Sequence, residues 1–255
     1  MLIIYTPKGE AGEYAKNAVN FYTGCSNGCD YCYLSKGRGK AIMGGTTVRF
    51  KKTLIDPSMA IKMLDRALLK DLPKYQEEGI FFSFTTDPLI EETYLQTLVA
   101  IKVCQTHNVP VTVLTKSAKG FDYLDHYAEK WGWNTNLITI GYTLTGCDDR
   151  EGKSSPNIDR IGVLESANFA YPTFVSLEPV IDVKKSIEMV EQSYEWVGIY
   201  KVGLESGKKY SKDDIEYLYM ELSRYAQEGV KIQLKNSVLR ALKMKREDLP
   251  EYFVK

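Results

Sequence analysis

The sequence predicts an α/β fold: a partial TIM barrel of the (β/α)6 type, built around a parallel sheet. Three observations predict it. From about residue 57, helical patterns alternate with short apolar strands, which is typical of βαβ units. With an early strand at 17–23, about six or seven such units can be counted, fewer than a closed eight-fold barrel requires. Polar residues also follow most strands, at the end where α/β barrels carry their active sites.

Each element has a local signal in the chain. Asp56 and Pro57 are typical of a helix N-cap and first turn, and apolar residues follow at helical spacing. Gly79 opens a short apolar strand that ends at Thr85. Later strands are expected from their β-branched content. The remaining expected strands are 109–117, 137–143, 173–178, 196–205 and 230–235, and the expected helices are 91–107, 157–170, 183–193 and 211–227.

Length and composition favour one domain over residues 1–255, because 255 residues suit a single α/β barrel. We expect a core at about 17–235, an N-terminal strand within 1–8 and a helical tail at 236–255. Hydrophobic residues make up 44% of the chain and charged residues 26%, an ordinary globular balance. The net charge is zero, which weighs slightly against a dedicated nucleic-acid-binding protein.

No feature of the sequence indicates a membrane or secretion. No apolar run is long enough to cross a bilayer, and the N-terminal residues MLIIYTPKGE lack the features of a signal peptide. We therefore expect a cytoplasmic protein without a membrane partner, whose thiols stay reduced. The five cysteines are then metal ligands or core residues instead of a disulfide framework.

Three of the cysteines form a compact motif. Cys25, Cys29 and Cys32 have the spacing C-x3-C-x2-C and follow the first expected strand. An iron–sulfur cubane normally takes four thiolate ligands, so three local ones leave one iron open to another molecule. Gly24 and Gly28 allow the loop to turn tightly around the sulfurs.

Two other interpretations of the motif stay open. The cysteines could be buried thiols, although loops rarely bury them. They could also bind zinc, which needs a fourth ligand. The chain has two histidines, His107 and His126, and both fall in or near expected helices. Of the other cysteines, Cys104 is expected in a helix core and Cys147 after a strand end.

The motif, with Tyr31 directly before its last cysteine, resembles the signature of the radical S-adenosylmethionine (SAM) superfamily. The stretch 5–34 is similar to the opening of the spore photoproduct lyase-like family, with Asn27 where many members have histidine. TTDP at 85–88 and LTKS at 114–117 resemble that family's second and third strand ends. The likeness covers roughly residues 5–180.

The resemblance implies two cofactors, a [4Fe-4S] cluster on the three cysteines and SAM bound through its amino and carboxylate groups to the open iron. In that superfamily, one electron from the cluster cleaves SAM, and the resulting 5′-deoxyadenosyl radical takes a hydrogen atom from a substrate. The protein must place SAM and exclude water. Two scattered cysteines are too few for a second cluster, so an external reductant such as a flavodoxin or ferredoxin is implied.

The resemblance also implies roles for five residues near the motif and the next two strand ends. Tyr31 would pack on the adenine of SAM. Lys116 would pair with the SAM carboxylate, because a point charge suits that anion, and Ser117 would assist with its hydroxyl. Thr86 and Asp87 stand where the family's second strand meets the SAM amino group.

Further roles follow for residues of later strands and for hydrogen transfer. Thr143 would reach the ribose of SAM, and Glu178 would bind the ribose or the substrate. Tyr33 and Cys147 are candidate catalytic residues. The lyase carries a hydrogen-donor cysteine where this chain has Phe84, so we expect a substrate other than the thymine dimer.

Two basic segments bear on the substrate. Residues 36–52 and 231–246 each carry six basic residues and no acidic residue. Such segments suit the phosphates of a nucleic acid or nucleotide, or they are ordinary solvated surfaces. The alternatives are a radical SAM enzyme acting on a peptide or small metabolite, which the zero net charge favours, and a non-enzymatic iron–sulfur or zinc protein.

Overall fold

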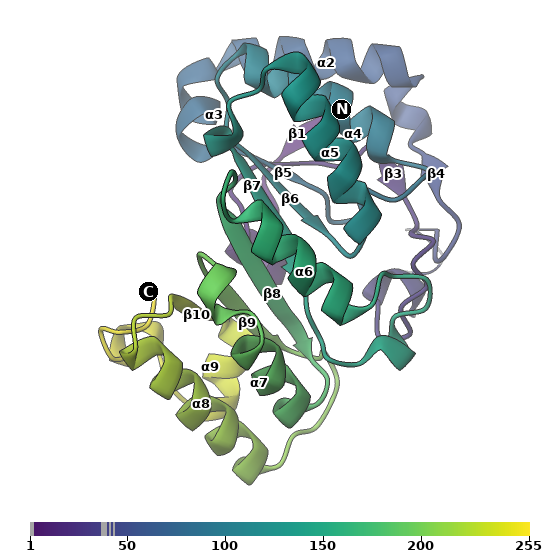
Figure 1. Ribbon diagram of the computed structural model, residues 1–255. Helices are drawn as coiled ribbons and strands as arrows, with labels where there is room; N and C mark the ends of the chain where they lie inside the picture. The colour runs from purple at the N-terminus through teal and green to yellow at the C-terminus, as the bar shows by residue number, and fades with distance from the viewer. Residues whose placement is uncertain (1–2, 37–39, 41, 43) are drawn as a thin grey trace. The chain divides into compact units, whose positions relative to one another are not determined.

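The computed structural model describes residues 3–36, 40, 42 and 44–255, which fall into two compact units (Figure 1). The first unit is Met1–Ile140 with Asp149–Ser155 and Ala170–Pro172. The second is Gly141–Asp148, Pro156–Phe169 and Thr173–Lys255. The strand β7 (Ile138–Thr143) contributes to both units.

The sheet of the first unit has the order β1-β2-β5-β6, followed by the start of β7. Its first two strands are antiparallel, and the β2–β5 and β5–β6 pairs are parallel. A second, two-stranded sheet is formed by β3 and β4. The bounds are β1 (Ile4–Tyr5), β2 (Ala18–Val19), β3 (Tyr22–Thr23), β4 (Arg49–Phe50), β5 (Ile80–Phe82) and β6 (Val111–Thr115).

The expected early strand at 17–23 is divided in the structure. Residues 18–19 join the main sheet, whereas 22–23 pair with β4. Asn20 lies between the two parts, where its side-chain amide donates to the Tyr5 hydroxyl and its carbonyl oxygen accepts from the Phe84 backbone N–H. These bonds hold the chain at the point where it leaves the main sheet.

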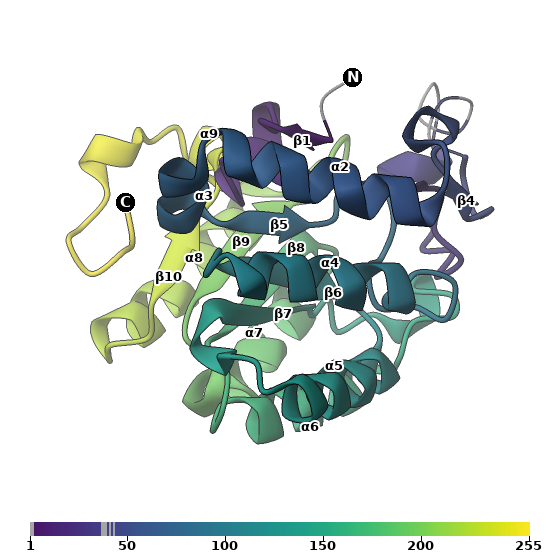
Figure 2. The ribbon, with the colours of Figure 1, turned by 90° about the horizontal axis from the view of Figure 1, so that it is seen from above.

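Helices of the first unit lie beside its parallel strands, as Figure 2 shows for α2, α4 and α5. The start predicted for α2 is confirmed, since Asp56 accepts a hydrogen bond from the Met59 N–H at 2.8 Å. Leu64, Leu68 and Cys104 are fully buried here. The bounds are α2 (Pro57–Lys70), α3 (Leu72–Glu78), α4 (Tyr94–Thr106) and α5 (Ala118–Trp131), with 3-10 turns η1 (Gly9–Glu13), η2 (Tyr33–Ser35), η3 (Lys52–Leu54) and η4 (Thr135–Leu137).

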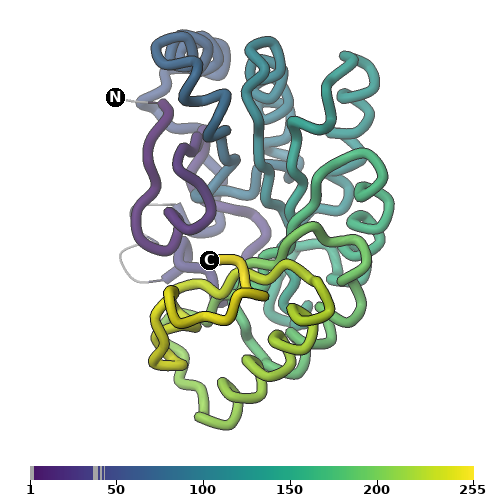
Figure 3. The backbone as a smooth tube through the Cα atoms, turned by 90° about the vertical axis from the view of Figure 1, so that its left-hand side faces the viewer, coloured from purple at the N-terminus to yellow at the C-terminus, as the bar shows by residue number. Residues whose placement is uncertain are grey.

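The second unit continues the alternation. The end of β7 is followed by β8 (Thr173–Val180), β9 (Tyr200–Leu204) and β10 (Ile232–Leu234), and the β8–β9 and β9–β10 pairs are parallel. Figure 3 follows this part of the chain in green to yellow. Its helices are α6 (Asn157–Ala167), α7 (Val183–Glu191), α8 (Lys212–Gln227) and α9 (Asn236–Leu242), with turns η6 (Tyr194–Trp196) and η7 (Arg246–Asp248). The turn η5 (Asp148–Arg150) has its first residue in this unit and its other two in the first unit.

Parallel strands alternating with helices confirm the predicted fold class, a partial (β/α)6-type barrel. The expected helical tail at 236–255 consists of α9 and a 3-10 turn. The single domain over 1–255 stays a prediction. Within the described residues, every helix is too short or too polar to cross a membrane.

A glycine in β7 gives a test of packing in the second unit. A Cβ on Gly141 would lie 1.9 Å from the ring of Phe174, so Gly141→Ala must displace a buried aromatic side chain. We expect it to lower the free energy of unfolding by about 1–3 kcal/mol in urea titrations. The matched Gly162→Ala in α6 meets nothing within 4 Å, and we expect it to stabilise by about 0.5–1 kcal/mol. Equal effects of the two substitutions would contradict the packing.

Candidate functional site

The three motif cysteines lie in a loop between β3 and η2 of the first unit. Gly24 has a φ of +75°, and a Cβ there would lie 2.0 Å from the backbone oxygen of Thr47. The Cys25 backbone N–H donates to the oxygen of Gly45 at 3.0 Å. Glycine is therefore required at position 24, because any side chain would push the loop away from residues 44–47.

The sulfurs of this loop are largely withdrawn from solvent. Cys29 is buried, and Cys25 and Cys32 are half-buried. Burial, with the negative charge of Asp87 second, raises the pKa of the Cys25 thiol to about 12, and burial raises the pKa of Cys32. Within the described residues, no three His, Cys, Asp or Glu side chains are drawn together as a ready-made metal site.

The chemistry of the donor set nevertheless fits an iron–sulfur cluster. The loop presents three thiols, which are soft ligands for iron–sulfur clusters and zinc. Its one carboxylate, Asp30, is engaged by the guanidinium of Arg150 at 2.8 Å. Gly24 and Gly28 both have positive φ, as a loop that wraps around a bulky group requires.

The histidines of the zinc alternative are engaged elsewhere in the described structure. His107 Nε2 lies 2.7 Å from Asp65 Oδ1, and the ring of His126 packs edge-on against Tyr127 in α5. In these contacts, both histidines are engaged away from the motif cysteines, so neither supplies the fourth ligand of a Cys₃His zinc site. Cys104 is fully buried in α4, as predicted for a core cysteine, and burial raises its pKa to about 12.

Asp87 joins the cysteine loop to the ends of two strands. Among the described residues, its Oδ2 accepts from the Asn27 side chain at 2.9 Å and from the Lys116 backbone N–H at 2.8 Å. Its Oδ1 accepts from the Thr115 hydroxyl at 2.6 Å and from the Leu89 N–H at 3.0 Å. This carboxylate follows β5, and it anchors both the loop and the end of β6.

The neighbouring hydroxyls also hold backbone in place. The Thr85 hydroxyl donates to the Tyr22 oxygen at 2.5 Å, and the Thr86 hydroxyl donates to the Gly24 oxygen at 2.6 Å. Ser117 is the N-cap of α5, where its Oγ accepts from the Gly120 N–H at 2.9 Å. The predicted contacts of Thr86 and Ser117 with SAM stay predictions, and in this structure both hydroxyls fasten the loop and the helix.

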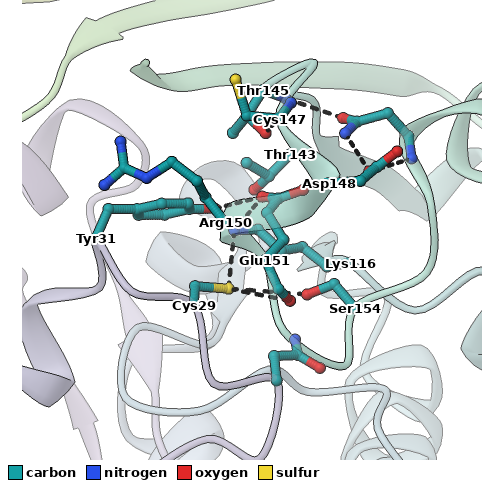
Figure 4. Close-up of polar contacts among 12 residues, drawn as sticks. Cys29, Tyr31, Lys116, Thr143, Thr145, Cys147, Asp148, Arg150, Glu151 and Ser154 are labelled. Carbon is teal, nitrogen blue, oxygen red and sulfur yellow. Dashed lines mark hydrogen bonds and ion pairs between the residues drawn. The ribbon is translucent and has the colours of Figure 1, made fainter.

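A buried ionic group stands beside the loop (Figure 4). Lys116 Nζ lies 2.9 Å from Glu151 Oε1, and the Glu151 side chain is 1% exposed. The Tyr31 hydroxyl donates to Glu151 and accepts from Lys116. Burial, then the charge of Glu151, raises the pKa of Tyr31. Tyr31 and Lys116, both predicted as site residues, are brought together by a carboxylate that the sequence did not indicate.

Glu151 reaches this position because its segment pairs with the cysteine loop. The Asp30 N–H donates to the Arg150 oxygen at 3.1 Å, and the Lys153 N–H donates to the Asn27 oxygen at 2.7 Å. A Cβ on Gly152 would lie 2.2 Å from that same Asn27 oxygen. The nearest sequence signal is this glycine, which follows β7 and has a positive φ.

Cys29 lies against the same segment. Its Sγ is 3.6 Å from Lys116 Nζ, 3.8 Å from the Glu151 backbone oxygen and 3.8 Å from Ser154 Oγ. The Lys116 ammonium therefore lies next to a buried sulfur, where its charge is little screened by water.

Tyr33, directly after the last motif cysteine, contacts Phe84. The Tyr33 side chain is 57% exposed, and its hydroxyl donates to the Phe84 oxygen. The Phe84 ring stacks on Phe81 with centroids 4.4 Å apart. Phe84 is therefore a packing residue, consistent with the absence of a hydrogen-donor cysteine at this strand end. The catalytic role of Tyr33 stays a prediction.

A pocket of about 220 Å³ lies in the first unit, next to the cysteine loop. Asn27, Lys116 and Ser117 line it, together with Lys119 and Tyr123 of α5. Two of the predicted site residues, Lys116 and Ser117, thus line one small cavity.

Three of the predicted site residues, Thr143, Cys147 and Glu178, belong to the second unit. Glu178 in β8 is paired with Lys235, which is 1% exposed, and a Cβ on Gly203 would lie 2.6 Å from Glu178 Oε1. The Thr143 backbone oxygen accepts from Arg160 at 2.7 Å. Cys147 is buried, with its N–H on the Thr145 hydroxyl. The cofactor contacts of Thr143 and Glu178 and the catalytic role of Cys147 stay predictions.

The two basic segments are partly used inside the protein. In 231–246, Lys235 is buried against Glu178, and Arg246 donates to the Leu234 oxygen and to Asn236. In 36–52, Arg38 lies outside the described residues, as do the other positions of 37–39, 41 and 43. Exposed basic side chains remain in both segments, at Lys40, Arg49, Lys52, Lys231, Arg240, Lys243 and Lys245.

Comparisons with known proteins gave matches in structure but none to a family model or a curated sequence. Solved structures of SuiB from Streptococcus suis match the chain. The chain shares its fold with the part of SuiB that it covers. The structure of SuiB bound to the precursor peptide SuiA aligns with a TM-score of 0.62 at 13% identity, over 89% of this chain and 50% of that one.

Two further SuiB structures agree. SuiB bound to S-adenosylmethionine gives a TM-score of 0.59 at 13% identity, covering 92% of this chain and 53% of that one. Another SuiB structure gives 0.56 at 14% identity, covering 89% and 51%. The chain spans about half the length of the SuiB chains that it matches.

The Asp87 junction gives a prediction for the first unit. The Asp87 carboxylate accepts four hydrogen bonds, two on each oxygen. In Asp87→Asn one of these oxygens becomes an NH₂ group, which then faces two hydrogen-bond donors. We expect a loss of about 3 kcal/mol in the free energy of unfolding, measured by urea titration. The exposed Asp122→Asn in α5 makes the same chemical change and should cost less than about 0.5 kcal/mol. Equal losses would show that Asp87 does not anchor the loop.

Proposed function

We propose that this protein is a radical SAM enzyme whose [4Fe-4S] cluster is held by Cys25, Cys29 and Cys32. The observation that carries the proposal is a glycine-turned loop of three thiols, with the lysine that follows β6 next to Cys29. The fold shared with SuiB, one structure of which holds SAM, supports it. When bound, the cluster and SAM supply one-electron cleavage of a sulfonium and removal of a hydrogen atom from a substrate.

The chain's own residues prepare this site before any cofactor binds. Gly24 and Asp87 fix the loop. Lys116 bonds the Tyr31 hydroxyl at one edge of the ring, and the Arg150 guanidinium lies 5.8 Å from the ring centroid. A ring so held offers one apolar surface for stacking, which supports its proposed contact with adenine.

Lys116 is proposed to bind the SAM carboxylate. An ammonium has three N–H donors, and the described structure gives them three acceptors, in Tyr31, Glu151 and Cys29. A SAM carboxylate would therefore replace one of these acceptors. We assign Asp87 to holding the loop instead of the SAM amino group, because its oxygens already accept four hydrogen bonds. Thr86, Ser117, Thr143 and Glu178 remain proposed SAM contacts.

We propose a peptide as the substrate class. SuiB has been crystallised with a precursor peptide, and the zero net charge of this chain suits a neutral partner better than a polyanion. A nucleic acid or nucleotide is the second candidate, as in a spore photoproduct lyase-like enzyme. The exposed basic side chains Arg49, Lys52 and Lys231 favour it. An external one-electron donor, a flavodoxin or ferredoxin, is part of either proposal.

Anaerobic reconstitution tests the enzyme. Protein treated with iron, sulfide, dithionite and SAM should hold about four irons per chain and release 5′-deoxyadenosine. Cys32→Ala should lose both, because a cluster ligand is gone. The matched Cys104→Ala removes a thiol buried in α4 and should keep both. Bound zinc without iron, or no 5′-deoxyadenosine above the Cys32→Ala level, would rule the enzyme out.

Binding measurements separate the two substrate classes. If the substrate is a peptide, fluorescence anisotropy at low salt should show no saturable binding of DNA or RNA oligonucleotides. Saturable binding that weakens steeply with salt would favour the nucleic acid, because phosphate contacts release counterions. In that case the charge-removing double substitution R49Q/K52Q should reduce the salt slope by about two.

A further inference from the structure

We infer that the buried Lys116–Glu151 pair sets the reduction potential of the cluster through Cys29. The inference rests on the proposed function, because it requires a cluster on the three cysteines. It adds two positioning residues to that function, one of which, Glu151, has no counterpart in the cysteine motif or the strand-end motifs.

The geometry places a charge pair directly behind one ligand. Lys116 Nζ is 3.6 Å from Cys29 Sγ and 2.9 Å from Glu151 Oε1. The ammonium thus lies in contact with both the sulfur and the carboxylate. The Tyr31 hydroxyl bonds to both charged groups and holds them in this arrangement.

Burial makes these charges effective. The side chains of Lys116 and Glu151 are 13% and 1% exposed. Coulomb interactions of buried groups are screened much less than those at the surface, where Asp30 pairs with Arg150 with its carboxylate 59% exposed. Reduction potentials of iron–sulfur clusters depend on local net charge and on hydrogen bonds to the sulfurs. The buried pair is therefore the stronger influence on Cys29.

The two members act with opposite signs. Reduction adds one electron from the external donor, so the reduced cluster is the more negative state. The ammonium on Cys29 stabilises that state and raises the potential, whereas the carboxylate of Glu151 offsets the ammonium and lowers it. The potential of the native protein is the balance between them, and removing either charge should move it in a defined direction.

The test is an EPR-monitored redox titration of the reconstituted protein and its variants. Glu151→Gln keeps the shape and removes the negative charge, so we expect a higher potential than in the native protein. Lys116→Met keeps the length and removes the positive charge, so we expect a lower potential. The double variant should lie between the two single variants, and Lys116→Arg should lie above Lys116→Met.

Exposed residues of α5 supply matched controls. Lys130→Met and Glu129→Gln make the same changes of charge at the surface of the same unit, and both should leave the potential at its native value. Shifts of the same sign in both site variants, or no shift beyond the controls, would overturn the inference. If one variant does not fold, the sign of the shift in the other decides.

The outcomes distinguish this inference from the proposed function. A native protein that holds iron and sulfide and forms 5′-deoxyadenosine, yet shows no opposed shifts, contradicts only the tuning role. A variant that folds by circular dichroism but takes up no iron also contradicts it, because the pair would then be needed to build the site. A native protein without a cluster overturns both.

Discussion

The carboxylate of Asp87 is the interaction on which the rest of the site depends. It lies in the loop after β5, and it accepts hydrogen bonds from Asn27 in the cysteine loop and from Thr115 and Lys116 at the end of β6. Parallel strands end at the same edge of a sheet, so one carboxylate there can reach both neighbours. The rigid sheet thereby fixes a loop that has little regular structure of its own.

Around this junction, the site is built from buried charges that are compensated. Moving Lys116 and Glu151 out of water costs several kcal/mol per ion, and their mutual attraction, with the Tyr31 hydroxyl, offsets that cost. Such groups are seldom kept for stability alone. The arrangement places a fixed pair of opposite charges next to Cys29, which is the property that the proposed cluster ligand would use.

The second unit repeats the pattern at its own strand ends. Lys235, which follows β10, is buried against Glu178 of β8, and Gly203 leaves the space that the Glu178 side chain fills. In both units, a lysine directly after a parallel strand meets a glutamate from elsewhere in the chain. In both pairs, the two side chains are largely buried.

The sequence by itself determined what depends on local patterns: the alternation of helices and strands, the capped start of α2, and the three cysteines with their glycine turns. Only the tertiary structure decided which distant groups meet. Glu151 lies 120 residues from Tyr31, and nothing in its surroundings predicts a buried acid. Likewise, three of the four hydrogen bonds that Asp87 accepts come from residues far from it in the sequence and could not be read from the TTDP motif. Burial and long-range pairing arise from how the strands assemble, and local spacing carries no record of that assembly.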